Sequence, residues 1–349
     1  MRYGSSSKWS HRQDTGSGQC TTDYFLDWDT PITECQVFVP GSVTSPAPTP
    51  GGGPLIDVAK IPFGSPGASV DQVSTTGEQP VASDIGAFRT VCDYSHMAFD
   101  DPIVKPGQPG ASHLHVFYGN TATTANSTAS SIASGGNSTC RGGTANRTAY
   151  WIPAMIDTRD GTPITAHNAG FYYKSGYYGI APSSVKALPQ GLRMVAGDSK
   201  NATANNAYGY FECSNGYGGR SAGVLNCPSG TSLMMHLDFP QCWDGVNLDS
   251  PDHKSHMSYP VAGKCPSTHP VATPVITFVI DWQIKETNAP LRWRFSSDNY
   301  STSSPGGYSM HGDWFNGWKA PVMDAWITKC VNPTKDCHSH LLGDGRAIY

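Results

Sequence analysis

The 349-residue chain is long enough for one large domain with a buried core and a small appendage. Charged residues make up 14% of it, against roughly 25% in an average soluble domain. The net charge of −4 and the lack of a Lys/Arg cluster exclude a basic face for nucleic acid. The 38 Gly, 27 Pro, 16 Tyr and 9 Trp indicate short strands and long ordered loops, and not a helix bundle. No apolar run approaches the roughly 18 residues of a membrane span.

The beginning of the chain differs from the rest. Residues 1–42 carry two cysteines and little apolar periodicity, and we interpret them as a small disulfide-containing segment. Residues 43–54 are rich in Pro and Gly and carry no charge, which is typical of a spacer. We therefore expect the main domain at residues 55–349. Residues 1–19 are polar and contain no secretory signal, so we expect any leader to have been removed.

Alternating apolar and polar residues predict most of the main domain to be strands. The predicted strands are residues 88–94, 113–118, 150–156, 231–239, 271–284 and 292–295, with 271–284 as the central strand. Residues 171–180 suit a sheet edge or hairpin, and 183–196 a short helix followed by a strand. Residues 121–148 predict a surface excursion, and residues 322–331 a helix. The fold class is a mostly β, disulfide-rich, sandwich-like domain with long ordered loops and few short helices.

The ten cysteines are an even number and lack the Cys-x-x-Cys pairs of metal sites. In an oxidising compartment they predict five disulfides between sequence neighbours, since such pairs close the loops between strands. The predicted pairs are Cys20–Cys35, Cys92–Cys140, Cys213–Cys227, Cys242–Cys265 and Cys330–Cys337. Asn-x-Ser/Thr triplets begin at Asn126, Asn137, Asn146, Asn201 and Asn299 and fit the same compartment. We expect a secreted, extracellular protein that can carry N-linked glycans.

The stretch from Asp238 to Pro260 is dense in acid/base and metal-ligand side chains. It includes Trp243, His253 and His256, and its prolines exclude a single helix or a central strand. Its four aspartates are Asp238, Asp244, Asp249 and Asp252. Such a loop favours a functional site over a core, although Asp249 before Ser-Pro reads as a turn cap. If the segment after Pro251 forms one helical turn, the two histidines share a face and bind either a metal or a substrate.

Two further segments offer partners for this loop. His113 and His115 lie two apart on an expected strand, so both rings project from one face, as a metal pair or as a base beside a substrate donor. Residues 311–318 combine His311 and Asp313 with the indoles of Trp314 and Trp318. Indoles beside polar groups suit the stacking of a sugar ring, and a buried core Trp is the alternative.

Several reaction classes are disfavoured by the motifs. There is no Gly-x-Ser-x-Gly elbow for a serine nucleophile and no His-Glu-x-x-His zinc pattern. The even cysteine count argues against a thiol nucleophile. Glycoside hydrolysis needs two facing carboxyl groups, and the chain offers Asp238, Asp244, Asp252 and Asp313 near aromatic residues that raise a carboxyl pKa by excluding water.

The motifs HLHVFYGN, DFPQCWDG followed by PDHKSHMSYP, and GYSMHGDWFNGW with a following Cys330 resemble the secreted domain family DUF1996. The resemblance covers roughly residues 86–342. The family occurs in fungi and bacteria, with some members joined to carbohydrate-binding modules, which implies a polysaccharide-related role. By motif match the implied site residues are His113, His115, Asp238, Trp243, Asp244, His253, His256, His311 and Asp313.

We therefore expect a secreted carbohydrate-active protein, more specifically a hydrolase of an extracellular or cell-wall polysaccharide without a required cofactor. The expected catalytic residues are Asp238, Asp244, Asp313 and His311. The expected substrate-binding residues are His113, His115, Trp243, His253, His256, Trp314 and Trp318. One cleft is expected to hold His113, His115, Asp238, His253, His256, His311 and Asp313. Asp313 is expected to pair with Asp238 or Asp244, with Trp243 and Trp314 nearby. The alternatives are a non-catalytic glycan-binding or cell-wall protein, and a metal-dependent enzyme, hydrolytic or oxidative, built on the histidines.

Overall fold

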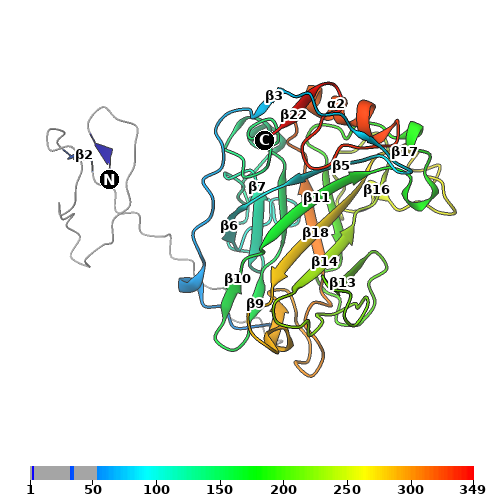
Figure 1. The fold of residues 1–349 in the computed structure, drawn as a ribbon. Coiled ribbons are helices and arrows are strands. Elements are labelled where there is room, and N and C mark those ends of the chain that lie inside the picture. The colour runs from blue at the N-terminus through cyan, green and yellow to red at the C-terminus, as the bar shows by residue number, and fades with distance from the viewer. Residues whose placement is uncertain (1, 4–31, 35–52) are drawn as a thin grey trace. The chain divides into compact units, whose positions relative to one another are not determined.

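A computed structural model describes residues 2–3, 32–34 and 53–349 (Figure 1). Contacts between Cα atoms divide the chain into two units, Met1–Thr44 and Ser45–Tyr349. In the first unit, the described residues are the antiparallel pair β1 (Arg2–Tyr3) and β2 (Ile32–Glu34). The predicted Cys20–Cys35 pair lies outside the described residues. None of the described helices is long and apolar enough to cross a lipid bilayer.

Two large sheets form the second unit, as the alternating sequence pattern predicts. The first has the strand order β13-β14-β18-β11-β5-β21-β4 and is antiparallel except between β21 and β5. Its strands are β4 (Val81–Ala82), β5 (Ala87–Val91), β11 (Asn168–Lys174), β13 (Gly209–Cys213), β14 (Ser232–Asp238), β18 (Val275–Gln283) and β21 (Lys335–Asp336). The predicted central strand is confirmed as β18. The prediction of an edge at residues 171–180 is wrong, because β11 lies between β18 and β5.

The second sheet is antiparallel, with the order β12-β20-β8-β7-β6. Its strands are β6 (Tyr94–Ala98), β7 (His115–Gly119), β8 (Ala149–Pro153), β12 (Arg193–Gly197) and β20 (His311–Phe315). The strand predicted from His113 begins only at His115. Successive side chains alternate between the two faces of each strand, so one face of this sheet packs against the seven-stranded sheet and the other turns away.

The main core lies between the two sheets and is strongly aromatic. Tyr150 of β8 stacks on Phe171 of β11 with ring centroids 3.9 Å apart, and Phe171 meets Phe278 of β18 at 4.7 Å. The Tyr173 hydroxyl accepts hydrogen bonds from the indole N–H groups of Trp314 and Trp318 at 3.2 and 3.0 Å. These buried polar atoms are therefore satisfied inside an otherwise apolar layer.

Shorter elements close the ends of the sandwich. The small sheets are β10-β9-β19 (Thr162–Ile164, Met155–Asp157, Trp293–Phe295), β16-β15-β17 (Met257–Ser258, Cys242–Trp243, Val271–Ala272) and β22-β3 (Arg346–Ile348, Val73–Thr75). The helices are α1 (Ala129–Ser134), α2 (Ala320–Trp326), the π-helical η5 (Ile327–Val331), and the 3₁₀ turns η1 (Val58–Lys60), η2 (Tyr177–Gly179), η3 (Pro182–Ser184) and η4 (Ala289–Arg292). The predicted late helix is thus found as α2 with η5.

The predicted surface excursion at residues 121–148 covers the outer face of the five-stranded sheet. A second hydrophobic cluster lies under it and contains Ile103, Phe117, Ile132, Ala149, Trp151 and Phe315. Ile132 belongs to α1, whose N-cap Thr128 accepts a hydrogen bond from the Ser131 backbone N–H. The excursion is therefore a cover with its own buried side chains, and both faces of the five-stranded sheet are buried.

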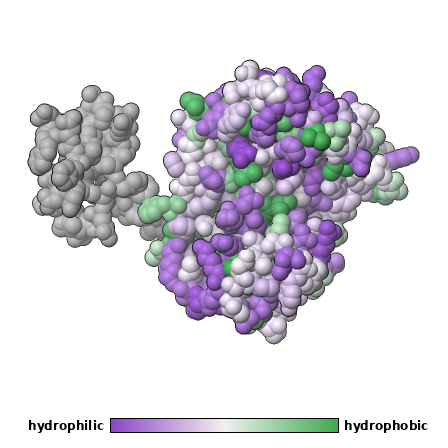
Figure 2. Space-filling view, in the orientation of Figure 1, coloured by the Kyte–Doolittle hydropathy of each residue, from purple (hydrophilic) through white to green (hydrophobic). Residues whose placement is uncertain are grey.

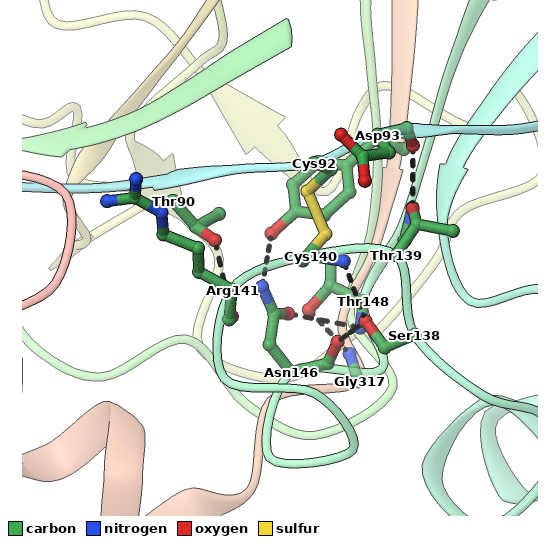
Figure 3. Close-up of a disulfide and its surroundings, with 12 residues drawn as sticks. Thr90, Cys92, Asp93, Ser138, Thr139, Cys140, Arg141, Asn146, Thr148 and Gly317 are labelled. Atoms are coloured by element: carbon green, nitrogen blue, oxygen red, sulfur yellow. Dashed lines mark hydrogen bonds between the residues drawn. A yellow bond between two sulfur atoms is a disulfide. The ribbon is translucent and has the colours of Figure 1, made fainter. Parts of the chain in front are cut away.

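The Cys92–Cys140 disulfide ties this cover to the strand region, with polar bonds around it (Figure 3). The Thr139 hydroxyl donates to the Asp93 carbonyl at 2.7 Å, and Asn146 donates to the Tyr150 hydroxyl at 3.5 Å (Figure 3). The predicted bridges Cys213–Cys227, Cys242–Cys265 and Cys330–Cys337 are confirmed as well. The four bridges of the described residues are typical of an oxidising compartment.

Candidate metal centre

Three histidines from two segments of the chain meet on the outer side of the five-stranded sheet. His115 begins β7 and His311 begins β20, while His113 lies two residues before β7. Alternation along β20 places His311, Asp313 and Phe315 on the covered outer face. His115 and His311 are buried, whereas His113 keeps some exposed surface and so marks the side that faces solvent.

The ligand nitrogens of these rings are close enough to share one ion. The Nε2 atoms of His113 and His311 are 3.0 Å apart, those of His115 and His311 are 3.5 Å apart, and all three ligand nitrogens lie within 4.8 Å of one another. A tetrahedral ion with bonds of roughly 2.0–2.1 Å holds two nitrogens about 3.3–3.4 Å apart. Two of the three separations are therefore close to those of a tetrahedral site, in which three histidines would leave one coordination position open.

Main-chain carbonyls orient two of the rings. His115 Nδ1 lies 2.9 Å from the Asp100 carbonyl oxygen, and His311 Nδ1 lies 2.8 Å from that of Ser309. A carbonyl oxygen only accepts, so each Nδ1 carries the proton and each Nε2 presents a lone pair. A proton on His113 can satisfy one such lone pair but not both. A cation can bind the Nε2 lone pairs of all three rings. A carbonyl that accepts from the other ring nitrogen of a histidine ligand is common around bound metals.

Burial keeps these rings neutral, which is the form that binds metal. It lowers the pKa of His115 and of His311 to about 4. The pKa of His113 lies well below its usual value, chiefly because its ring is enclosed and secondly because the other two imidazoles are close. At neutral pH the three rings therefore require no deprotonation before binding a cation.

Two aspartates lie beside the histidines. Asp313 is buried, and neither of its carboxyl oxygens has a hydrogen-bond partner among the described residues. Burial raises the pKa of Asp313 well above its usual value, and the charge of Asp101 raises it further. Asp101 accepts hydrogen bonds from the backbone N–H groups of Ile103 and Val104, both at 2.9 Å, and burial raises the pKa of Asp101 too. Asp313 is thus a carboxyl group available for proton transfer next to the histidines.

Lys254 connects the Asp238–Pro260 stretch to β12, next to this site. Its ammonium group donates to the Gly197 carbonyl at 2.6 Å, and Gly197 pairs with His311 across β12 and β20. The positive charge of Lys254 lowers the pKa of both His311 and Asp313. His253 lies close enough to lower the pKa of Asp101 by its charge. The sequence patterns did not single out Lys254 as a site residue.

The two histidines of this stretch do not form a helical turn. His253 has a φ of 59° and its Nδ1 lies 3.0 Å from Asp249, so the expected shared helical face is wrong. His256 is buried, and its ring bonds to the Ser250 hydroxyl and, at 2.7 Å, to the Arg193 carbonyl. His256 therefore holds the loop against β12, and the structure does not place it with the three converging rings.

The structure separates Asp238 and Asp244 from Asp313. Asp238 is half-buried on the outer face of the seven-stranded sheet, whereas Asp313 is on the outer face of the five-stranded sheet, so the core lies between them. Asp244 is half-buried and accepts hydrogen bonds from the backbone N–H groups of Val246 and Asn247, which makes it a turn cap. The expected single cleft is therefore wrong for Asp238, and the aspartate that adjoins Asp313 is Asp101.

The predicted tryptophan platforms also differ from expectation. Trp314 and Trp318 are completely buried, with their indole N–H groups bonded to Tyr173 inside the core, so neither offers a ring face to a sugar. Trp243 is partly exposed, and its indole N–H donates to the Asn247 carbonyl at 2.6 Å. Of the three, only Trp243 lies at the surface.

The fold and this centre define a disulfide-bridged β-sandwich with a buried three-histidine site. The model of the family described as "Domain of unknown function (DUF1996)" matches residues 101–318, and the chain belongs to this family. The matched region begins at Asp101 and includes all three histidines and Asp313. Comparison with curated proteins and with solved structures found no match.

Proposed function

We propose that this protein is a metal-dependent hydrolase whose metal ion is held by His113, His115 and His311. The observation that carries the proposal is the convergence of three Nε2 atoms, two of them fixed as lone pairs by carbonyls behind the rings. Three protein ligands and one open position are the arrangement of catalytic zinc, whereas structural zinc sites use four ligands. The metal would supply Lewis-acid activation of a bound water.

Nearby side chains have distinct roles in this proposal. Asp313 accepts the proton of the attacking water and returns it to the leaving group, since it is on the same strand face as His311 and neither of its carboxyl oxygens has a hydrogen-bond partner among the described residues. Lys254 provides positive charge toward the reacting centre from the Gly197 side. Asp101 fixes its own loop through two backbone N–H groups and supplies the neighbouring negative charge.

An extracellular polysaccharide remains the proposed substrate. The support for it is indirect: disulfides indicate an oxidising compartment, and the chain is rich in tyrosine and poor in charge. A partly exposed His113 would face a substrate arriving from solvent.

A metal-free, two-carboxylate hydrolase is the second candidate, and one observation favours it. Asp101 and Asp313 are both buried and both have a raised pKa. They are close enough for the charge of Asp101 to raise the pKa of Asp313. One protonated and one ionised carboxyl group are what glycoside hydrolysis requires. This pair replaces the expected pairs of Asp313 with Asp238 or Asp244.

Metal analysis of the purified chain tests the two candidates. We expect about one transition-metal ion per chain by mass spectrometry, loss of hydrolysis of a polysaccharide panel after chelation, and recovery when zinc is restored. His311→Ala should lower metal affinity by more than about 100-fold, because it removes one of three ligands. The matched control is His338→Ala, which replaces a partly exposed histidine beside Asp336. This variant should bind metal like the unchanged chain.

The outcomes separate the candidates. Activity that survives complete metal removal and disappears in Asp101→Asn supports the carboxylate pair and overturns the metal-dependent proposal. A chain that binds no metal, with His311→Ala and the unchanged chain alike in every assay, overturns the metal site itself.

A further inference from the structure

The outer face of the seven-stranded sheet carries an open array of tyrosines and charged side chains. Alternation puts Leu233, Met235 and Leu237 of β14 into the core, and turns His236 and Asp238 outward. Neighbouring strands add Tyr172 and Lys174 of β11 and Tyr210 of β13, which are half-buried like the outward residues of β14. We call Tyr172, Lys174, Tyr178, Tyr210, His236 and Asp238 the tyrosine face.

This face turns toward the viewer in Figure 1, where β11, β18, β14 and β13 lie side by side in front. Figure 2 shows the same side of the molecule, with hydrophilic residues mixed among residues of intermediate hydropathy and hydrophobic ones in separate spots. A surface of this kind lacks the continuous apolar area that marks a lipid site or a tight protein interface. A ligand that fits this surface would be polar and have some apolar area.

Asp238 is held in place at one side of the array. It accepts hydrogen bonds from the hydroxyls of Tyr178 and Thr277, the latter at 2.6 Å. Tyr178 itself is 40% exposed and has a φ of 52°, a conformation uncommon for a residue with a side chain. The fixed carboxylate keeps acceptor positions for a ligand, since an ionised carboxylate has about four lone pairs.

Lys174 is the free donor of the face. Its Nζ lies 4.8 Å from the ring centroids of both Tyr172 and Tyr177, and it forms no ion pair or hydrogen bond within the described part of the chain. Asp238 is close enough for its charge to raise the pKa of Lys174, against the lowering by burial. The ammonium donor and the carboxylate acceptor therefore lie close together on one surface.

Tyr210 provides a second rigid element. Its ring stacks on His236, with centroids 4.6 Å apart and planes at 10°, and the Arg220 guanidinium lies 4.0 Å above the ring centroid. His236 Nε2 is 3.0 Å from a carboxylate oxygen of Glu212. On this side of the sheet the positive charges of Lys174 and Arg220 lie among the negative charges of Glu212 and Asp238, so the surface carries both signs and does not favour a strongly charged polymer.

We propose that the tyrosine face binds a neutral polysaccharide strand, on the opposite side of the sandwich from the three histidines. A sugar hydroxyl both donates and accepts hydrogen bonds, and so matches a surface that places ammonium, phenol and carboxylate groups side by side. The pyranose ring has apolar C–H faces that can pack on a tyrosine ring, and Tyr178 is 40% exposed. Polar neighbours already hold Tyr178, Asp238 and His236, so these side chains lose little freedom on binding.

Calorimetric titration of the full chain tests this proposal without any activity assay. The ligands are a soluble neutral β-glucan and a neutral galactomannan, with polygalacturonate as the anionic comparison. We expect one of the neutral polymers to bind, and the double variant Lys174→Ala/Tyr178→Ala to weaken that binding at least 10-fold. The double variant Lys105→Ala/Tyr349→Ala changes exposed residues outside the face and should bind like the unchanged chain.

Measurements of folding and of metal content show whether the face variant changes only glycan binding. Circular dichroism and the melting temperature of the face variant should match the unchanged chain, and its metal content should be unchanged because the histidines lie on the other sheet. Failure of the metal proposal would leave this binding intact. The proposal is overturned if neither neutral polymer binds, if the face variant binds as well as the unchanged chain, or if only polygalacturonate binds.

Discussion

The outer faces of the two sheets differ in their cover. The five-stranded sheet is covered by the excursion with α1, and its outward side chains, such as Phe117 and Trp151, are completely buried. The seven-stranded sheet leaves outward side chains such as His236 and Asp238 half-exposed. The two faces therefore place titratable groups in different surroundings within one sandwich.

This difference decides what each face can do. On the covered face, burial lowers the pKa of His115 and His311 and raises that of Asp313, so neutral ligands and a protonatable carboxyl group occur together. On the open face, Asp238 and Lys174 stay within reach of water and of a long ligand. Water exclusion suits a small reactive centre, whereas exposure suits an extended polymer.

The largest effect is expected from Asp313→Asn on the covered face. Asparagine keeps the shape of the side chain but cannot take up a proton, so the hydrolysis rate should fall by about 100-fold to 10,000-fold. Metal content should stay within a factor of about three, since Asp313 is not one of the three converging ligands. A single-turnover assay and metal analysis of the same sample check this. Full activity in the variant would remove Asp313 from the mechanism.

A matched pair of aromatic residues compares the stabilities of the two faces. Phe315 on the covered face and Tyr210 on the open face each have an arginine over the ring, at 4.8 and 4.0 Å. Phe315→Ala should cost about 3–5 kcal/mol of unfolding free energy because it leaves a cavity. Tyr210→Ala should cost about 1 kcal/mol, since water fills the space. Urea unfolding of both variants measures the difference, and equal costs would contradict the contrast between the faces.

The metal-free protein should lose stability as the pH falls from about 6.5 to 4. An unfolded histidine has a pKa near 6.5, whereas the folded pKa of His115 and His311 is about 4, so in this window only the unfolded chain takes up their protons. The loss is complete below the folded pKa and should be about 3 kcal/mol per ring, because the folded and unfolded pKa values differ by about 2.5 and each pKa unit corresponds to about 1.4 kcal/mol. Urea unfolding at pH 7 and pH 4.5, with chelator present, measures it.

The control for this pH dependence is His115→Gln, which should remove one ring's share of the loss. The His338→Ala variant, whose histidine is partly exposed, should keep the whole loss. An equal pH dependence in His115→Gln and the unchanged chain would mean that the buried rings titrate normally.

The smallest expected effect is the change in stability caused by N-linked glycans when the chain is produced in a eukaryotic secretory host. Asn126 and Asn299 are exposed, whereas Asn146 is completely buried and bonded to Tyr150. Asn201 donates to three main-chain carbonyls, which ties its amide to the loop. We expect occupancy at Asn126 and Asn299, and none at Asn146, by peptide mass spectrometry. A glycan changes an exposed position by tenths of a kcal/mol at most; occupancy at Asn146 would contradict the buried cover.

Much of the fold followed from sequence because strands with one core face alternate visibly. Residues 231–239 show this pattern and contain β14, while the apolar run at residues 271–284 contains β17 and β18. The four confirmed disulfides followed from the rule of neighbouring pairs. Strand β20 is buried on both faces, so its sequence gave no sign of which tryptophan faces solvent, and Trp314 was assigned to a surface that it does not reach.

The site could be predicted only in part, for a related reason. The density of His113, His115 and His311 marked them as candidates, but their convergence depends on how β7 and β20 are placed in the sheet. Asp101 directly precedes Pro102 in the sequence, and no local pattern links it with Asp313. Lys254 reaches Gly197 across 57 residues, a contact that spacing in the sequence cannot reveal.

The arrangement of the bridges along the chain has a consequence for biosynthesis. The confirmed pairs span 48, 14, 23 and 7 residues, and the spans follow one another without overlap or nesting. Each cysteine therefore meets its partner as the next cysteine to leave the ribosome, and short loops close at a lower entropic cost than long ones. The four described bridges, when formed in this order, need no reshuffling by an isomerase, although the sheets pair strands far apart in sequence.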